Sequence, residues 1–217
     1  MLIEIATLVC HEASVVFICT LRLGWSVVII GINGRTFSVE NPAGAVNAGI
    51  QITRQLLDSD DETILFGHRP QDGAIGHTSR FDSGLLLDSQ LYGWAWEQTV
   101  LPARIRGYDL DVFYAPNGNP PIVHGSTPTV TWVHSTQWFR GYTPAGYSLV
   151  QHALMPRVYR HTDQIITVSE FAASELISEL DVPREKISVV YNGVDDIFHS
   201  EDAGDPLDLP DEYILSV

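Results

Sequence analysis

Lysine is nearly absent from this sequence, and basic residues as a class are few. Lys186 is the single lysine among 12 basic residues, which face 27 acidic residues and leave a formal net charge of −15. Such a charge opposes binding to nucleic acid or to an anionic membrane surface. Abundant carboxylates with so little lysine are typical of a halophilic protein, because a salt-rich cytoplasm screens their repulsion. An ordinary acidic cytosolic protein is the alternative.

Cysteine is also scarce, since Cys10 and Cys19 are the only two. Two cysteines make no disulfide framework, and the sequence has no C-x-x-C or H-E-x-x-H motif for a metal ion. We therefore expect a reducing, cytoplasmic compartment and chemistry that needs no metal.

A clean hydrophobic run is missing from the first 26 residues. Glu4, His11, Glu12 and Arg22 interrupt this segment, so it fits neither a secretory signal nor a membrane span. We interpret residues 1–26 as an atypical N-terminal extension, such as one added by a start codon assigned too early. The alternative is an extra helix or strand packed on the domain.

What the sequence does have is a hydrophobic core and an alternation of strand and helix patterns. Apolar residues make up 45% of the 217, enough for one domain, or for one domain and a fragment of another. Apolar, β-branched runs typical of buried parallel strands alternate with segments of helical spacing, which predicts an α/β, Rossmann-like fold with a doubly wound, mostly parallel sheet. The predicted strands are residues 27–32, 62–67, 111–115, 129–133, 164–168 and 187–191, and the predicted helices are residues 45–59, 91–105, 144–160 and 170–180.

The segment between the second strand and the second helix is harder to interpret. Residues 68–89 are polar and glycine-rich, with a candidate short strand at 84–87. In the following helix, Trp94 and Trp96 are predicted core residues, because large aromatic side chains dominate core burial. A ligand-binding role for them is the alternative.

Polar residues follow three of the predicted strands at the point where each strand ends. They are His134 with Ser135, Ser169 with Glu170, and Asn192 with Gly193. Ligands of doubly wound sheets bind beyond the carboxyl ends of the strands, so this edge is the predicted site. Each position also has a structural reading: a hydrogen-bonded histidine, a helix cap at Ser169, and a turn at Asn192.

Three segments, in this order and spacing, resemble the N-terminal domain of family 4 glycosyltransferases. They are VHSTQWF from Val133, IITVSEFAASEL from Ile165 and VPREKISVVYNGVDDIF from Val182. The resemblance runs from about residue 28 to the end, is strongest over 163–198 and is poor over 67–94. It implies the N-terminal half of a GT-B fold, from a retaining enzyme that uses a nucleotide-sugar donor.

The resemblance also implies roles for particular residues at the predicted site. His134 matches a histidine at the reaction centre and is the candidate catalytic residue. Ser135 stands where the family usually has an acid, so a sugar-hydroxyl contact is altered or absent. The candidate substrate-binding residues are Gly44, Ser135, Trp138, Ser169 and Asn192.

Two of these candidates keep an alternative reading. Gly44 follows Ala43 where the family usually has two adjacent glycines, so it is either a ligand contact or a turn residue. Trp138 is either part of an aromatic platform for the acceptor or a core residue.

The resemblance divides the chain and implies that part of the enzyme is missing. Residues 27–199 match the acceptor-side domain, 200–212 an acidic linker, and 213–217 the first strand of a C-terminal domain. That absent domain would supply a Glu-x7-Glu element and an Arg/Lys pair for the nucleotide-sugar.

We therefore predict the N-terminal domain of a hexosyltransferase-type enzyme that moves a sugar to a glycan or lipid-linked acceptor. It would be inactive without its partner half, would need no cofactor beyond the donor substrate, and would contact a membrane peripherally if the acceptor is lipid-linked. The alternatives are a non-catalytic sugar-binding module and a fragment of a GT-B-shaped sugar-nucleotide epimerase.

Overall fold

Seven strands form one sheet in which every pairing is parallel, in the order β3-β2-β1-β4-β5-β6-β7. The structure is a computed structural model that describes residues 27–38, 44–67, 80–82, 90–136 and 145–193. The strands are β1 (Ile29–Asn33), β2 (Glu62–Phe66), β3 (Arg80–Asp82), β4 (Val112–Ala115), β5 (Thr129–Val133), β6 (Gln164–Thr167) and β7 (Ile187–Val189).

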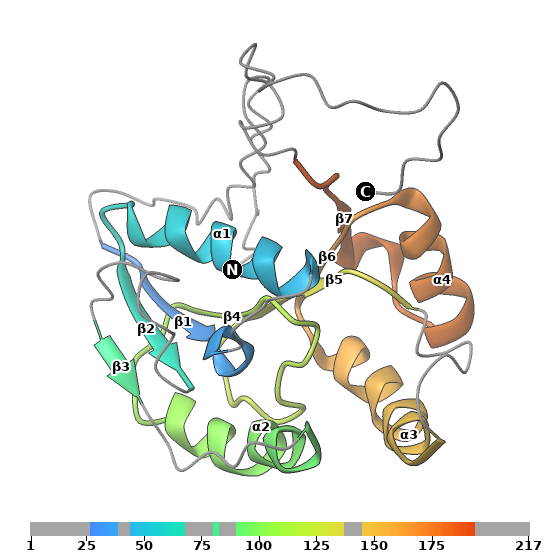
Figure 1. The fold of residues 1–217 in the computed structure, drawn as a ribbon, viewed down its shortest axis with the longest axis horizontal. Helices are drawn as coiled ribbons and strands as arrows, with labels where there is room; N and C mark the ends of the chain where they lie inside the picture. Colours follow the sequence, from blue (N-terminus) through green and yellow to red (C-terminus); the bar gives the residue numbers. More distant parts are fainter. Residues whose placement is uncertain (1–26, 39–43, 68–79, 83–89, 137–144, 194–217) are drawn as a thin grey trace, which may run out of the picture.

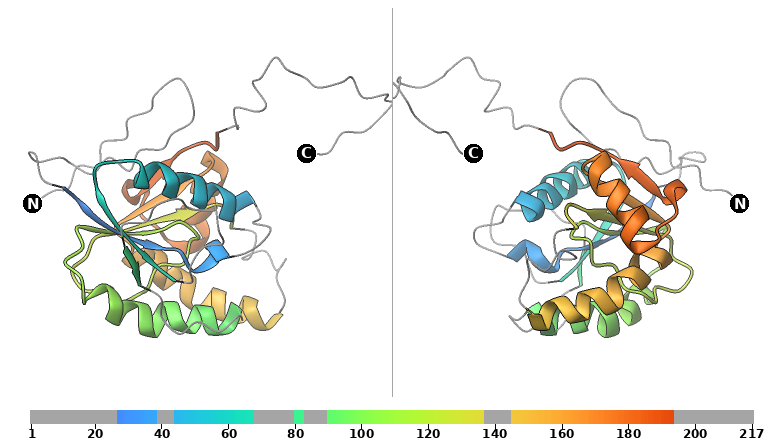
Figure 2. Two further views of the ribbon diagram at one scale, coloured as in Figure 1. Left: turned by 60° about the vertical axis from the view of Figure 1, so that its left-hand side comes forward. Right: turned by 90° about the vertical axis from the view of Figure 1, so that its right-hand side faces the viewer.

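Helices cover both faces of this sheet, as the α/β prediction requires. Helix α1 lies on one face, while α2 and α3 lie on the other, and α4 packs with α3 against β5 to β7 (Figures 1 and 2). The helices are α1 (Gly44–Leu57), α2 (Gln90–Ile105), α3 (Ala145–His161) and α4 (Glu170–Leu180), with short 3-10 helices η1 (Arg35–Ser38) and η3 (Arg184–Lys186).

The apolar strand runs form the core because both faces of the sheet are covered. Ile30 and Ile32 of β1 point toward α1, whose Ile50 and Leu56 are also buried. On the opposite face, the cluster beneath α2 contains Trp96, as the sequence predicted. Trp94 is half-buried and packs against the cluster formed by α3 and α4. None of the described helices is long and apolar enough to cross a bilayer.

The sequence predictions hold for six strands and four helices, to within a few residues at their ends. The third strand in chain order, β3 (Arg80–Asp82), was not predicted, because it is short and pairs only at the sheet edge. The candidate strand at 84–87 lies outside the described residues. So do Trp138, the extension 1–26 and the segments 200–212 and 213–217, which therefore remain predictions.

The strand order reverses between β1 and β4, which is the position where doubly wound sheets bind ligands. From β1 the chain builds toward β3, and from β4 it builds the other way toward β7. Two described segments begin at this reversal: the β1 loop (residues 34–38) and the β4 loop (residues 116–128). Since parallel strands share one carboxyl edge, the β1 loop and the first residues of the β4 loop lie at the edge where doubly wound sheets bind ligands, and the last residues of the β4 loop lead to the amino end of β5.

Candidate functional site

His134 lies at the carboxyl end of β5 with its ring held on two sides. Its Nε2 is 3.2 Å from the carbonyl oxygen of Pro116, the first residue of the β4 loop. Its ring stacks on Trp132, with centroids 5.3 Å apart and planes inclined by 6°. A carbonyl oxygen can only accept a hydrogen bond, so Nε2 donates and carries the proton. The ring orientation is thus fixed by one hydrogen bond and one stacking contact.

The protonation state of His134 follows from its half-buried position. Burial lowers the pKa of the imidazole from 6.5, and the hydrogen bond to the Pro116 carbonyl opposes this only in part. The ring is therefore neutral at pH 7, with its lone pair on Nδ1. A neutral imidazole in this tautomer can accept a hydrogen bond from a hydroxyl group.

The two residues after His134 differ in exposure. Ser135 is exposed, whereas Thr136 is buried and donates from its hydroxyl to the Glu175 carboxylate of α4. Beside this bond, Thr136, Glu175, Glu179 and Leu180 line a small cavity with room for about one water molecule. Among the described residues, no group of three or more His, Cys, Asp or Glu side chains is placed to hold a metal ion.

Ser169 caps a helix in this structure. Its Oγ accepts a hydrogen bond from the Ala172 N–H at 3.1 Å, so it is the N-cap of α4. Glu170 occupies the first turn, where a carboxylate suits the helix dipole, and lies 3.9 Å from the guanidinium of Arg184. The structural reading of Ser169 is therefore confirmed, and a ligand role for it stays a prediction.

The other two described candidates are open to solvent. Gly44 is the exposed first residue of α1, and a Cβ added to it would meet no atom within 4 Å. Asn192 is exposed beyond β7, near the exposed Tyr191. Their sheet-edge positions are compatible with ligand contact.

A buried polar cluster at the end of β1 was missed by the sequence reasoning. Glu97 of α2 accepts hydrogen bonds on Oε1 from Asn33 Nδ2 and from Arg35 Nε, each at 2.9 Å. Burial raises the pKa of the Glu97 carboxyl, although the Arg35 charge and both hydrogen bonds act in the opposite direction. The available signal was a single carboxylate between apolar residues of one helix, together with an Asn-x-Arg sequence directly after a buried strand.

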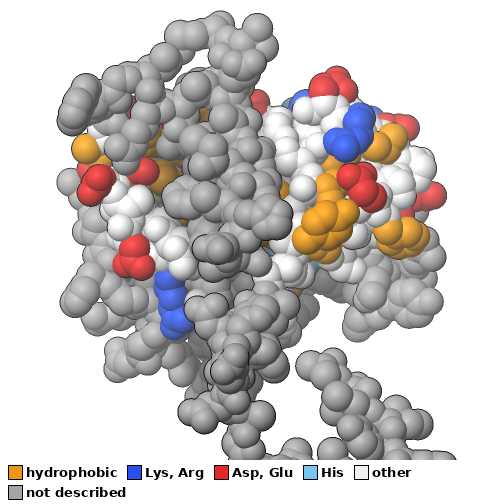
Figure 3. Space-filling view, turned by 90° about the horizontal axis from the view of Figure 1, so that it is seen from above, with side chains coloured by type: hydrophobic (Ala, Val, Ile, Leu, Met, Phe, Trp, Pro, Cys, Tyr) orange, Lys and Arg blue, Asp and Glu red, His pale blue; other side chains and the backbone are white. Residues whose placement is uncertain are grey.

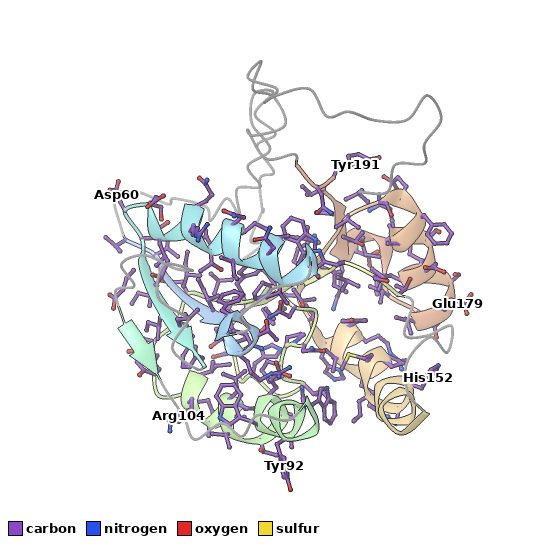
Figure 4. The ribbon with its side chains drawn as sticks, viewed as in Figure 1. Asp60, Tyr92, Arg104, His152, Glu179 and Tyr191 are labelled. Atoms are coloured by element: carbon purple, nitrogen blue, oxygen red, sulfur yellow. The ribbon has the colours of Figure 1, made fainter. Side chains whose placement is uncertain are left out.

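Exposed hydrophobic side chains occur over α4 and beyond β7. Phe171 and Tyr191 are 63% and 68% exposed, and the surface over this region mixes such side chains with charged ones (Figure 3). Tyr191 stands at the end of β7, while Glu179 points outward from α4 (Figure 4). Both aromatic residues lie near the carboxyl edge of the sheet.

Comparison with known proteins identifies relatives of this chain. The family model described as Glycosyltransferase Family 4 matches residues 42–197. A glycosyltransferase from Rickettsia africae ESF-5 has a similar structure, with a TM-score of 0.51 and 12% identity over 84% of this chain and 47% of its own. Anabaena Alr3699/HepE in complex with UDP matches with a TM-score of 0.52 and 16% identity over 79% of this chain and 46% of its own.

A second structure of the Anabaena protein, with UDP and glucose, matches similarly: TM-score 0.52 and 16% identity over 78% of this chain and 45% of that chain. Identities this low show a shared fold and no more. The chain spans about half the length of these solved proteins. Among curated proteins, the comparison finds no match.

Proposed function

Because the chain belongs to glycosyltransferase family 4, we propose that it is the N-terminal, acceptor-side domain of a retaining, hexosyltransferase-type enzyme. The reaction moves a sugar from a nucleotide-sugar donor to a hydroxyl group of a glycan or lipid-linked acceptor. The domain works together with a second, donor-binding domain and is inactive without it. No metal and no cofactor other than the donor substrate takes part.

The position of His134 is the observation that carries this proposal. The ring lies at the carboxyl edge of the sheet, one strand from the reversal of strand order, and is half-buried with a fixed orientation. In the proposed role, Nδ1 accepts a hydrogen bond from a sugar hydroxyl next to the bond that is broken. A ring held before the ligand arrives lowers the cost of orienting that hydroxyl.

The neighbouring candidates have supporting roles in this proposal. The exposed Ser135 hydroxyl contacts the same sugar, and the open N-terminus of α1 at Gly44 accepts another part of the ligand. Asn192, exposed beyond β7, contacts the acceptor, and Trp138 is a further candidate for that contact. Ser169 contributes mainly by starting α4 where it does.

Charge supports assigning the donor to a second domain. A departing nucleoside diphosphate needs cations or helix N-termini to stabilise its charge. This chain has a net charge of −15, and Arg35, near the strand-order reversal, is already paired with Glu97. The similar Anabaena protein, which holds UDP and glucose, is about twice as long as the matching part.

Calorimetric titration of the full chain tests the proposal. The probes are UDP-glucose, and a panel of glucose, mannose, galactose and N-acetylglucosamine with disaccharides of each. We expect at least one saccharide to bind with a Kd of about 1 mM, and UDP-glucose to bind only when a donor-binding domain is supplied. Binding of UDP-glucose without any saccharide binding would contradict the assignment, as would sugar transfer by the chain alone.

A further inference from the structure

Two adjacent residues of α2, Glu97 and Gln98, connect this helix to both loops at the strand-order reversal. Glu97 bonds to Asn33, at the end of β1, and to Arg35, in the β1 loop. Gln98 bonds to the β4 loop twice: its Nε2 donates to the Pro120 carbonyl at 3.1 Å, and its Oε1 accepts from the Ile122 N–H at 3.0 Å. One turn of helix therefore holds both loops.

The two loops also bond to each other, and the β4 loop bonds to His134. Asn33 Nδ2 donates to the Asn119 carbonyl at 3.3 Å as well as to Glu97. Asn117 of the β4 loop donates from its side-chain amide to the Thr36 hydroxyl of the β1 loop. The same β4 loop provides the carbonyl that holds the imidazole of His134. These hydrogen bonds, joined through the backbone of the β4 loop, link α2 to that ring.

The geometry of Glu97 indicates positioning rather than simple stabilisation. The side chain is 0% exposed, and its Oε2 has no hydrogen-bond partner among the described residues. A buried carboxylate with one unpaired oxygen is unfavourable, and apolar residues of similar volume often replace buried ion pairs without loss of stability. An apolar residue at position 97 would not hold the Asn33 amide and the Arg35 guanidinium in fixed orientations, because it accepts no hydrogen bond.

Arg35 also lies against Gly93, one turn before Glu97 on the same face of α2. A Cβ added to Gly93 of α2 would lie 2.4 Å from Arg35 Nη1, so the guanidinium rests on a glycine that has no side chain. Arg35 N–H also donates to Asn33 Oδ1 at 3.2 Å, which closes the β1 loop on itself. Backbone and side chain of this loop are therefore both fixed.

We propose that Glu97 and Gln98 are positioning residues for the site around His134. They fix the β1 and β4 loops, and through the β4 loop they fix the direction of the imidazole. Neither touches the ligand, and each acts through the loop it binds. This inference rests on the proposed function, because a fixed imidazole direction matters only if His134 contacts the sugar.

Three variants of the full chain test the proposal: Glu97→Gln, Gln98→Ala and, as control, Glu185→Gln. The control removes the same charge from an exposed position in η3, which precedes β7 and so lies at the opposite edge of the sheet. The readouts are the ¹H–¹³C ring signal of His134, assigned by its loss in His134→Ala, amide hydrogen exchange, and the Kd for the tightest saccharide of the panel above.

We expect Glu97→Gln to speed exchange at the Arg35 amide, and Gln98→Ala at the Ile122 amide, by about tenfold each. In both variants the ring signal of His134 should shift and the saccharide Kd should rise by about threefold or more. Glu185→Gln should leave all three readouts at their wild-type values. If Glu97→Gln does not fold, Gln98→Ala decides the question by the same readouts.

Two results would overturn parts of the account, and they can be told apart. If saccharides bind the wild-type chain but the His134 signal stays unmoved in the variants while their loops exchange faster, the positioning role is wrong. If no saccharide binds the wild-type chain, the proposed function fails, whatever happens to the ring signal.

Discussion

The two sides of the strand-order reversal end in different kinds of polar structure. On the β1 side, Asn33 and Glu97 are fully buried and bond to each other and to Arg35. On the β5 and β6 side, His134 and Ser169 are half-buried and Ser135 is exposed; the His134 ring bonds to the Pro116 carbonyl, and Ser169 bonds to the Ala172 N–H of its own helix. Buried polar groups that bond to one another fix a loop, whereas half-exposed groups in fixed positions remain able to bind a ligand.

Removing the carboxylate of Glu97 is expected to have the largest effect. Glu97→Ala leaves the Arg35 guanidinium and the Asn33 amide without their partner and should lower the free energy of unfolding by about 3–5 kcal/mol. Glu179→Ala, at an outward-facing glutamate of α4 (Figure 4), should change it by less than about 0.5 kcal/mol. Urea denaturation of both variants measures these changes. If both variants lose the same free energy of unfolding, the buried cluster on the β1 side is no more important to stability than an exposed residue.

Alanine substitutions at two glycines compare the tightly packed backbone beside the β1 loop with the open start of α1. Gly67 has φ +145°, and a Cβ there would lie 2.8 Å from the backbone nitrogen of Arg35, so Gly67→Ala should destabilise by about 1–3 kcal/mol. Gly44→Ala meets open space in the first turn of α1 and should not destabilise. Thermal melts of the pair measure the difference. Equal tolerance at both positions would show that the β1 loop is not tightly held.

The cap at Ser169 should account for a smaller effect. Ser169→Ala removes the acceptor for the Ala172 N–H and should lower stability by about 1 kcal/mol. Ser169→Asp, which keeps a capping oxygen, should restore most of it. If Ser169→Ala has no effect on denaturation but abolishes saccharide binding, the residue belongs to the ligand site instead.

The pH dependence of stability should show the smallest effect. The pKa of His134 is lowered in the folded state, so unfolding takes up a proton and stability falls as pH drops below 6.5. His134→Gln should lose less stability than the wild type between about pH 7.5 and 5.5. Identical slopes in denaturation at these pH values would mean that the ring titrates as it does in the unfolded chain.

Sequence patterns predicted the features that depend on neighbouring residues, namely buried strands and a helix cap. The runs at 129–133 and 164–168 identified β5 and β6, because buried parallel strands are apolar on both faces. The cap at Ser169 could be recognised from three residues of sequence. In contrast, the bond between Arg35 and Glu97 joins residues 62 positions apart, and only the packing of α2 beside β1 brings them together. The short strand β3 is polar at both ends and gave no pattern.

The resemblance predicted where His134 lies in the fold but not which residues hold its ring. His134 lies where the quoted motif placed it, at the carboxyl end of β5. Its partners Pro116 and Trp132 depend on the neighbouring strand and on ring stacking, which no motif encodes. The roles of Gly44, Ser135, Trp138 and Asn192 toward a ligand remain predictions.

Titrating the chain with saccharides while observing its histidine ring signals tests the central claim most directly. The account predicts that the His134 signal moves saturably with the added sugar, while those of His124 and His161, on the amino side of the sheet and on α3, stay in place. A saccharide that binds by calorimetry yet leaves the His134 signal unchanged would contradict it.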